Sequence, residues 1–217
     1  GVNDYVNVGN AASLNITGEI TISAWVKPNV VEGEVSIFSR FSGNSGYELR
    51  VEIAYTPDRL AMIVADGTTW KLASDTGNVF SAGKWQHVVG VYDGTNVKLY
   101  LNNVLLTTTA SNPPGAVSAV AYIGQRASAY YWNGSIDEVR IYNRALTAEE
   151  VLASYRGLYV SRTGLVGEWL MQEGTGSTID DTSDESNVGT IYGASWVEIP
   201  PRIQGIQSIT GINQIIF

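Results

Sequence analysis

Short segments in which apolar and polar residues alternate are the feature that most constrains the fold. Residues 20–26 and 47–53 alternate with a period of two, which is typical of β-strands with two different faces. Further short segments with strand character follow at 59–64, 85–92, 97–101 and 119–123. Turn-forming sequences separate them, at Asp66-Gly67, Asp93-Gly94, Asn102-Asn103 and 112–115. This pattern predicts an all-β, antiparallel jelly-roll sandwich.

One short helix is expected near residues 147–156. Thr147 and Glu150 have the spacing of a capping box, in which each residue binds the backbone of the other. Val151 begins a short apolar face, and Gly157 ends the helix.

Length and composition restrict the function. The chain has 217 residues, which fits one domain, with 13 Lys and Arg, 21 Asp and Glu and a net charge of −8. An acidic chain is a poor partner for nucleic acid, and no run of about 18 apolar residues predicts a membrane span. The lack of Cys excludes disulfides and a Cys nucleophile. The start at Gly1, without Met, suggests a processed or trimmed chain.

Five motifs point to a known family. They are DYVNVG at 4–9, ITISAWV at 20–26, GKWQHV at 83–88, GTNVKLYLN at 94–102 and NGSIDEVRIYNRALT at 133–147. In this order they resemble the laminin-G-like and pentraxin-like domains of the concanavalin A-like lectin/glucanase superfamily. The resemblance covers residues 1–157 and implies two stacked, curved antiparallel sheets.

The order of the strand blocks departs from that family. Residues 164–197 resemble the first strand block of such a domain, although they come last here. Residues 1–163 thus form a laminin-G-like sandwich without that block, and 198–217 form an Ile-rich tail. An incomplete sandwich exposes a sheet edge that another segment must fill. The block either folds back as a circular permutation or acts as a donor strand to a neighbouring copy through Leu165, Val166 and Trp169. A fragment of a longer tandem array is a third interpretation.

The tail has a period that fits neither a strand nor an α-helix. Its isoleucines recur at every third position, at Ile203, Ile206, Ile209, Ile212 and Ile215. An exposed apolar ridge favours aggregation, so we expect the tail to pack against another subunit. A disordered end with a chance periodicity is the alternative.

Motifs for catalysis are missing from the sequence. Glu48 and Glu52 alternate along one segment, but Arg50 stands between them on the same face, which predicts a solvent-exposed strand surface. His87, the single histidine, follows Trp85 and is expected to be structural. The sequence has no nucleophile elbow, phosphate loop or HExxH motif, so we predict that the protein is not an enzyme.

A calcium site is implied by the resemblance. Related domains often hold a structural Ca²⁺ between the loop that corresponds to 180–187 and a strand aspartate. By this resemblance the ligands are Asp181, Asn187 and Asp137. The family commonly shows Gly and Asn where this chain has 184–186. An ordinary acidic surface turn is the alternative.

Aromatic residues near turns suggest a platform for carbohydrate, since their rings stack on the apolar faces of sugars. The candidates are Trp70, Tyr130, Tyr131 and Trp132, with core packing as the alternative. Asn15 and Asn133 begin sequons for N-glycosylation.

Together these features predict a non-enzymatic extracellular or surface protein for adhesion. By strand exchange it would assemble with copies of itself into a filament or fibre and contact glycans. A monomeric, circularly permuted lectin-like module and a virion fibre or decoration protein are the alternatives.

Overall fold

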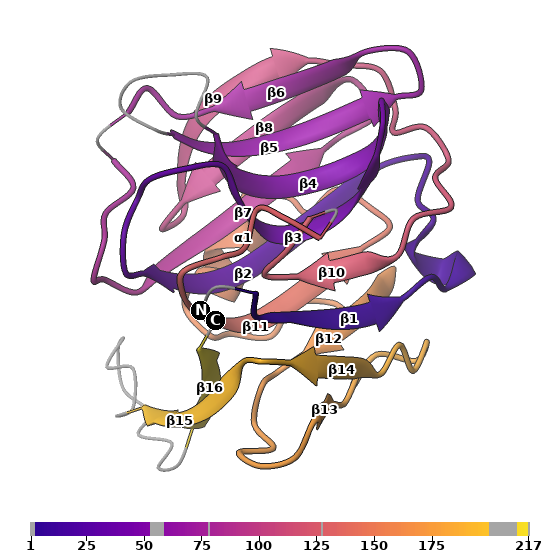
Figure 1. The fold of residues 1–217 in the computed structure, drawn as a ribbon. Helices are drawn as coiled ribbons and strands as arrows, with labels where there is room; N and C mark the ends of the chain where they lie inside the picture. Colours follow the sequence, from indigo (N-terminus) through magenta and orange to yellow (C-terminus); the bar gives the residue numbers. More distant parts are fainter. Residues whose placement is uncertain (1–2, 53–58, 78, 127, 200–211, 217) are drawn as a thin grey trace.

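The computed structural model describes residues 3–52, 59–77, 79–126, 128–199 and 212–216 of the chain. The described residues form two stacked antiparallel sheets and one short α-helix, which confirms the predicted jelly-roll sandwich (Figure 1). No helix within these ranges is long and apolar enough to cross a membrane.

Sheet A is the front layer in Figure 1 and has eight strands. In spatial order they are β13 (Thr178–Ile179), β14 (Gly189–Tyr192), β1 (Tyr5–Gly9), β10 (Ala121–Ile123), β3 (Val35–Ser42), β4 (Ser45–Glu52), β5 (Arg59–Asp66) and β6 (Trp70–Ser74).

Sheet B lies behind it and also has eight strands. Its order is β15 (Ser195–Ile199), β16 (Ile212–Ile216), β11 (Gly134–Tyr142), β2 (Ile20–Pro28), β7 (Gln86–Tyr92), β8 (Asn96–Leu101) and β9 (Val104–Ala110). The eighth strand, β12 (Leu165–Trp169), pairs with β11. Since β2 occupies one edge of β11 along most of its length, β12 and β16 share the other edge end to end.

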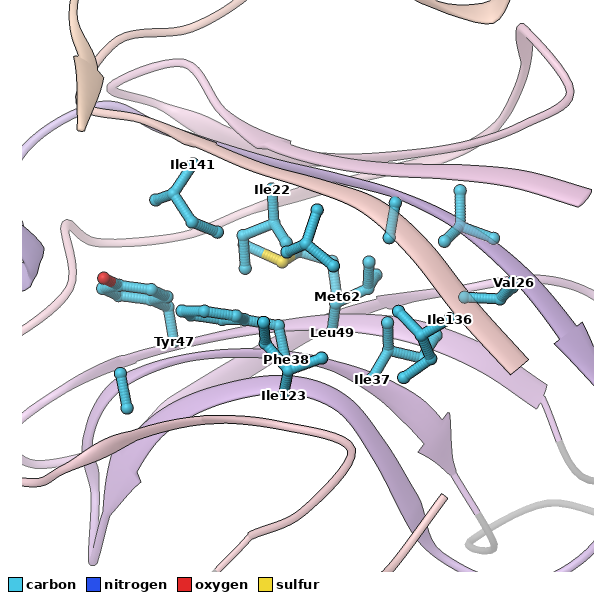
Figure 2. Close-up of a cluster of buried hydrophobic side chains, with 14 of the residues drawn as sticks. Ile22, Val26, Ile37, Phe38, Tyr47, Leu49, Met62, Ile123, Ile136 and Ile141 are labelled. Atoms are coloured by element: carbon cyan, nitrogen blue, oxygen red, sulfur yellow. The ribbon is translucent and has the colours of Figure 1, made fainter. Parts of the chain in front are cut away.

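The main core fills the space between the two sheets. Figure 2 shows Ile22 and Ile136 of sheet B meeting Phe38, Leu49 and Met62 of sheet A. All five side chains are fully buried, as the period-two alternation of their strands predicts. Burial of an aliphatic or aromatic side chain of this size contributes about 1.5–3 kcal/mol.

The helix α1 (Ala148–Tyr155) lies on the outer side of sheet B. The predicted capping box is confirmed: Glu150 N–H donates to Thr147 Oγ1 at 3.3 Å, and Thr147 N–H donates to Glu150 Oε2 at 3.0 Å. Val151 packs with Tyr142 and Leu165 in a second, smaller cluster outside the main core. A 3₁₀ helix, η1 (Ala12–Leu14), follows β1.

The displaced strand block completes its own chain. Strand β12 pairs with β11, where Val139 lies opposite Trp169, and β14 pairs with β1. Trp169 is fully buried in the main core, with its ring 6.2 Å from that of Phe38. The structure therefore has the circular permutation, in which the block folds back on its own chain, and not the donor-strand exchange. The expected donor strand fills its own sheet, so the filament prediction loses the open edge on which it rested.

The described end of the tail also packs within the chain. Residues 212–216 form β16, which pairs with β11 and β15, and Ile215 is fully buried in the main core. Two expectations are therefore wrong for residues 212–216. They pack against their own chain and not against another subunit, and the period of three does not exclude a strand. Ile203, Ile206 and Ile209 lie outside the described residues.

Candidate functional site

Four tyrosines gather on the outer side of sheet A, and we call them the tyrosine face: Tyr5, Tyr122, Tyr131 and Tyr192. The Tyr5 ring stacks on that of Tyr192 with centroids 4.8 Å apart and meets the Tyr122 ring edge-on at 5.7 Å. Tyr131 completes the group, with its ring 6.3 Å from that of Tyr5. Tyr192 is 45% exposed, so the group presents aromatic surface to solvent.

Strand register brings these tyrosines together. Tyr5 lies directly opposite Tyr192, and Asn7 lies opposite Tyr122, so Tyr5 and Tyr122 are diagonal neighbours. Val6, the next residue of β1, points into the main core, which places the tyrosines on the other side of the sheet. The strands β14, β1 and β10 lie side by side in Figure 1.

The phenol group of Tyr5 stays protonated near neutral pH. Burial raises the pKa of Tyr5, and the nearby phenols of Tyr192 and Tyr122 raise it further. A neutral phenol both donates and accepts a hydrogen bond. The tyrosine face therefore combines aromatic rings with polar hydroxyl groups.

The loop that follows β10 extends this surface towards β3. Its Tyr130 carbonyl accepts a hydrogen bond from Ser36 N–H at 3.0 Å, and the Arg126 guanidinium lies 4.2 Å from the Tyr130 ring centroid. Tyr130 has φ of 56°, an uncommon conformation for a bulky residue, and is 40% exposed. Contacts on both sides thus hold Tyr130 in place beside the tyrosine face.

Beneath this loop lies a buried cluster of charged side chains on the outer side of β4. Glu48 is fully buried, with its Oε2 3.2 Å from an Arg50 nitrogen and its Oε1 3.2 Å from Arg126 Nε. Arg50 also pairs with Glu52 and, at 2.6 Å, with Glu34. The predicted solvent-exposed strand face is therefore wrong, because Glu48, Arg50 and Glu52 are buried and form ion pairs with one another and with Glu34 and Arg126.

We expect Glu48 to make stability depend on pH. Burial raises its pKa to about 6, and the two guanidinium groups offset only part of this effect. The folded state then holds the proton more tightly than the unfolded chain, whose glutamate pKa is 4.5. Stability should fall as the pH rises from 4.5 to 6, by on the order of 2 kcal/mol, and then level off.

Denaturant unfolding at several pH values measures this effect. Glu48→Gln cannot titrate, so the fall between pH 4.5 and 6 should vanish from its profile. Glu185→Gln, at an exposed position, should keep the wild-type profile. Identical profiles for wild type and Glu48→Gln would contradict the assignment.

The sequence-predicted carbohydrate residues do not form one platform. Tyr130 and Tyr131 lie on or beside the tyrosine face. Trp70 is 44% exposed but lies on β6, at the far edge of sheet A. Trp132 is 1% exposed and packs against Phe80 at a ring distance of 6.3 Å, so it offers no ring to a ligand.

His87 is buried between β2 and α1. Its Nε2 lies 2.9 Å from Ser23 Oγ and 3.2 Å from Ser154 Oγ, and its ring lies 5.2 Å from that of Trp25. These contacts tie the helix to sheet B, which fits the predicted structural role.

The predicted calcium residues are engaged in the fold. Asp181 Oδ1 accepts hydrogen bonds from Glu168 N–H at 2.8 Å and Ser183 N–H at 2.9 Å, and its Oδ2 accepts one from Asn187 N–H at 2.7 Å. Asn187 donates to Val166 O at 2.9 Å. Asp137 is fully buried on β11. Backbone N–H groups thus contact both oxygens of Asp181 and hold this loop against β12.

Within the described ranges, no three His, Asp or Glu side chains are placed to hold a metal ion. Calcium binding by Asp181, Asn187 and Asp137 stays a prediction. It requires that EDTA lower the melting temperature of the wild type and leave that of Asp181→Ala unchanged.

Asp181 itself should stabilise the loop without metal. We expect Asp181→Ala to lower the free energy of unfolding by about 2 kcal/mol in EDTA, since three backbone donors lose their acceptor. Asp184→Ala, an exposed change in the same loop, should cost less than about 0.5 kcal/mol. Equal stability of the two variants by denaturant unfolding would refute this role.

Both sequon asparagines make local hydrogen bonds. Asn15 Oδ1 accepts from Val117 N–H at 3.0 Å, and Asn133 Oδ1 accepts from Asn29 Nδ2 at 2.9 Å. Asn15 is exposed and Asn133 is half-buried, and glycosylation of either stays a prediction.

Two stacked antiparallel sheets in this strand order form a jelly-roll sandwich. Residues 1–152 match the family model described as the concanavalin A-like lectin/glucanases superfamily, and the chain belongs to this family.

Relatives and solved structures extend this comparison. The chain is 27% identical over 138 residues to an α-L-arabinofuranosidase of Bifidobacterium longum subsp. longum, a match that covers 59% of this chain and 12% of that protein. A putative carbohydrate-binding protein from Bacteroides ovatus has a TM-score of 0.66 at 19% identity, over 88% of this chain and 56% of that one.

A second solved structure is domain 4 of AbnA, a GH43 extracellular arabinanase from Geobacillus stearothermophilus, in complex with arabinotriose. Its TM-score is 0.54 at 22% identity, over 64% of this chain and 68% of that one. At such identities the solved structures establish the fold alone. The chain thus spans about an eighth of its curated relative and just over half of the Bacteroides protein.

Proposed function

We propose that this chain is a non-enzymatic carbohydrate-binding module whose ligand stacks on the tyrosine face. The observation that carries the proposal is the cluster of tyrosines on the outer side of sheet A, with Tyr192 45% exposed and stacked on Tyr5. The C–H groups on one side of a sugar ring pack on such rings, while its hydroxyls bond to the phenols.

The comparisons suggest which sugar to test first. One relative is an α-L-arabinofuranosidase, and one solved domain of similar fold was determined with arabinotriose. Oligosaccharides of α-L-arabinofuranose are therefore the first ligand class. We also infer an extracellular or surface location, in keeping with an arabinanase described as extracellular.

The carboxylates of β4 argue against glycoside hydrolysis. A glycosidase needs two carboxyl groups that face the scissile bond from an open cleft. Glu48 is fully buried, and both Glu48 and Glu52 pair with Arg50. Neither is free to reach a sugar, which supports a binding role.

Calorimetry with arabinotriose tests the proposal on the full chain. Tyr192→Ala should weaken binding about tenfold, because it removes an exposed ring from the stack. Trp70→Ala removes an equally exposed aromatic at the far edge of the sheet and should leave binding unchanged. Wild-type affinity in Tyr192→Ala would refute the assignment of this face.

Self-assembly by strand exchange has no observation in its favour here, because β12 and β14 pair within the chain. Thermal unfolding at several protein concentrations tests this alternative.

A further inference from the structure

A cavity of about 410 Å³ lies on the side of the sandwich away from the tyrosine face. Strands β11 and β12 provide Arg140 and Glu168, and the chain after α1 provides Leu158, Tyr159 and Arg162. Its size falls within the range of about 300–1,000 Å³ that small-molecule sites occupy.

The cavity and the tyrosine face are separate. Tyr142 and Leu165 line the cavity and belong to the cluster beneath α1, on the outer side of sheet B. Their neighbours Ile141 and Val166 point into the main core. The cavity therefore opens from the outer side of sheet B, and the tyrosine face from the outer side of sheet A.

Paired charges make the cavity wall polar but neutral. Arg140 Nε lies 2.8 Å from Glu168 Oε1, and another Arg140 nitrogen lies 3.0 Å from Glu138 Oε2. Arg162 lies 2.7 Å from Glu168 Oε2. Two guanidinium groups and two carboxylates compensate each other, so nothing in this wall selects for an ionic ligand.

The same ion pairs hold these groups in fixed positions. The Glu168 side chain is 9% exposed, and it also accepts a hydrogen bond from Thr182 Oγ1 at 2.7 Å. Side chains that are already ordered lose little entropy when a ligand binds. The wall thus presents donors and acceptors in a preorganised arrangement.

Large apolar side chains stand at the edge of the cavity. Tyr159 is 81% exposed and Leu158 is 60% exposed, although both are of a size that normally favours burial. The segment is anchored, since Leu158 N–H donates to Ala153 O at 2.9 Å and Val160 packs on the outer cluster. The exposed Tyr159 ring therefore lies beside charged groups that are fixed in position and together carry no net charge.

We propose that this cavity is a second saccharide-binding site, for a neutral sugar. The proposal deepens the proposed function, because sites on opposite faces would let one module hold two glycan chains and gain avidity. A sugar matches both features of the cavity: its hydroxyls meet the Arg and Glu groups, and its apolar face meets Tyr159.

NMR titration of the full chain tests the proposal with four probes: arabinotriose, xylotriose, cellotriose and trigalacturonic acid. At least one neutral probe should shift the amide signals of Leu158 and Tyr159 and the side-chain signals of Arg162. Tyr159→Ala should weaken that binding about tenfold, and Tyr159→Phe should restore it. Leu105→Ala, at an exposed position on the far edge of sheet B, is the matched control.

The two sites can fail independently. Tyr192→Ala should leave the cavity signals responsive, whether or not the tyrosine face binds sugar. Shifts at the cavity with trigalacturonic acid alone, or with none of the four probes at millimolar concentration, would overturn the proposal. If arabinotriose causes no shift of the Tyr5 and Tyr122 signals in the wild type, the proposed function is overturned instead.

Discussion

Trp169→Ala should lower the free energy of unfolding by about 3–5 kcal/mol, the cost of removing a fully buried large aromatic from a core. The ring packs beside Phe38, and its Nε1 donates to Asn187 O at 2.8 Å, so the change also leaves a buried carbonyl without its donor. Chemical denaturation measures the loss. Trp70→Ala, the same substitution at an exposed site, should cost less than about 0.5 kcal/mol.

Thermal unfolding of the wild type at several protein concentrations separates the two ways of placing the displaced block. If residues 164–197 complete their own chain, the melting temperature of wild type does not depend on protein concentration. If they complete a neighbour, it rises with concentration, because assembly and folding are then coupled. A concentration-dependent melting temperature would restore the strand-exchange model.

Glu168→Gln should destabilise the protein by about 3–5 kcal/mol, because it breaks a largely buried ion pair and leaves charge without compensation. Glu168 binds both Arg140 and Arg162, at 2.8 and 2.7 Å. The matched control is Glu138→Gln, at a more exposed carboxylate that pairs with Arg140. A smaller loss for Glu168→Gln than for Glu138→Gln would contradict this account.

The pH dependence gives a second test of Glu168. Burial acts to raise the pKa of Glu168, but hydrogen bonds from Arg140, Arg162 and Thr182 outweigh it and hold the pKa below the ordinary value. The stabilisation is then complete above the unfolded-state pKa of 4.5 and is lost as the pH falls through the folded-state pKa. Wild type and Glu168→Gln should therefore converge in stability in acid.

The strands and the helix could be predicted because their signals are local. Alternation along residues 20–26 and the capping box at Thr147 need no knowledge of the rest of the chain, and both are confirmed. The place of residues 164–197 could not be predicted, because a sheet edge accepts a strand of its own chain or of another with the same hydrogen bonds. The structure resolves this through the pairing of β12 with β11.

The candidate site was harder to predict because its residues meet only through register. Tyr5, Tyr122 and Tyr192 are far apart in sequence, and only the pairing of three strands makes them neighbours. The alternation of Tyr5 with Val6 was the one local sign that an aromatic residue faces outward. Glu48 was misassigned for the same reason, since its partner Arg126 comes from a distant loop.

The origin of Tyr192 in the last strand block has a consequence for biosynthesis. Tyr5 leaves the ribosome almost two hundred residues before its stacking partner. A nascent chain can form most of sheet A and still lack Tyr192, one of the four residues of the tyrosine face. Sugar binding on that face would then require that residues 164–197 have docked, and a bound ligand would favour their docking by mass action.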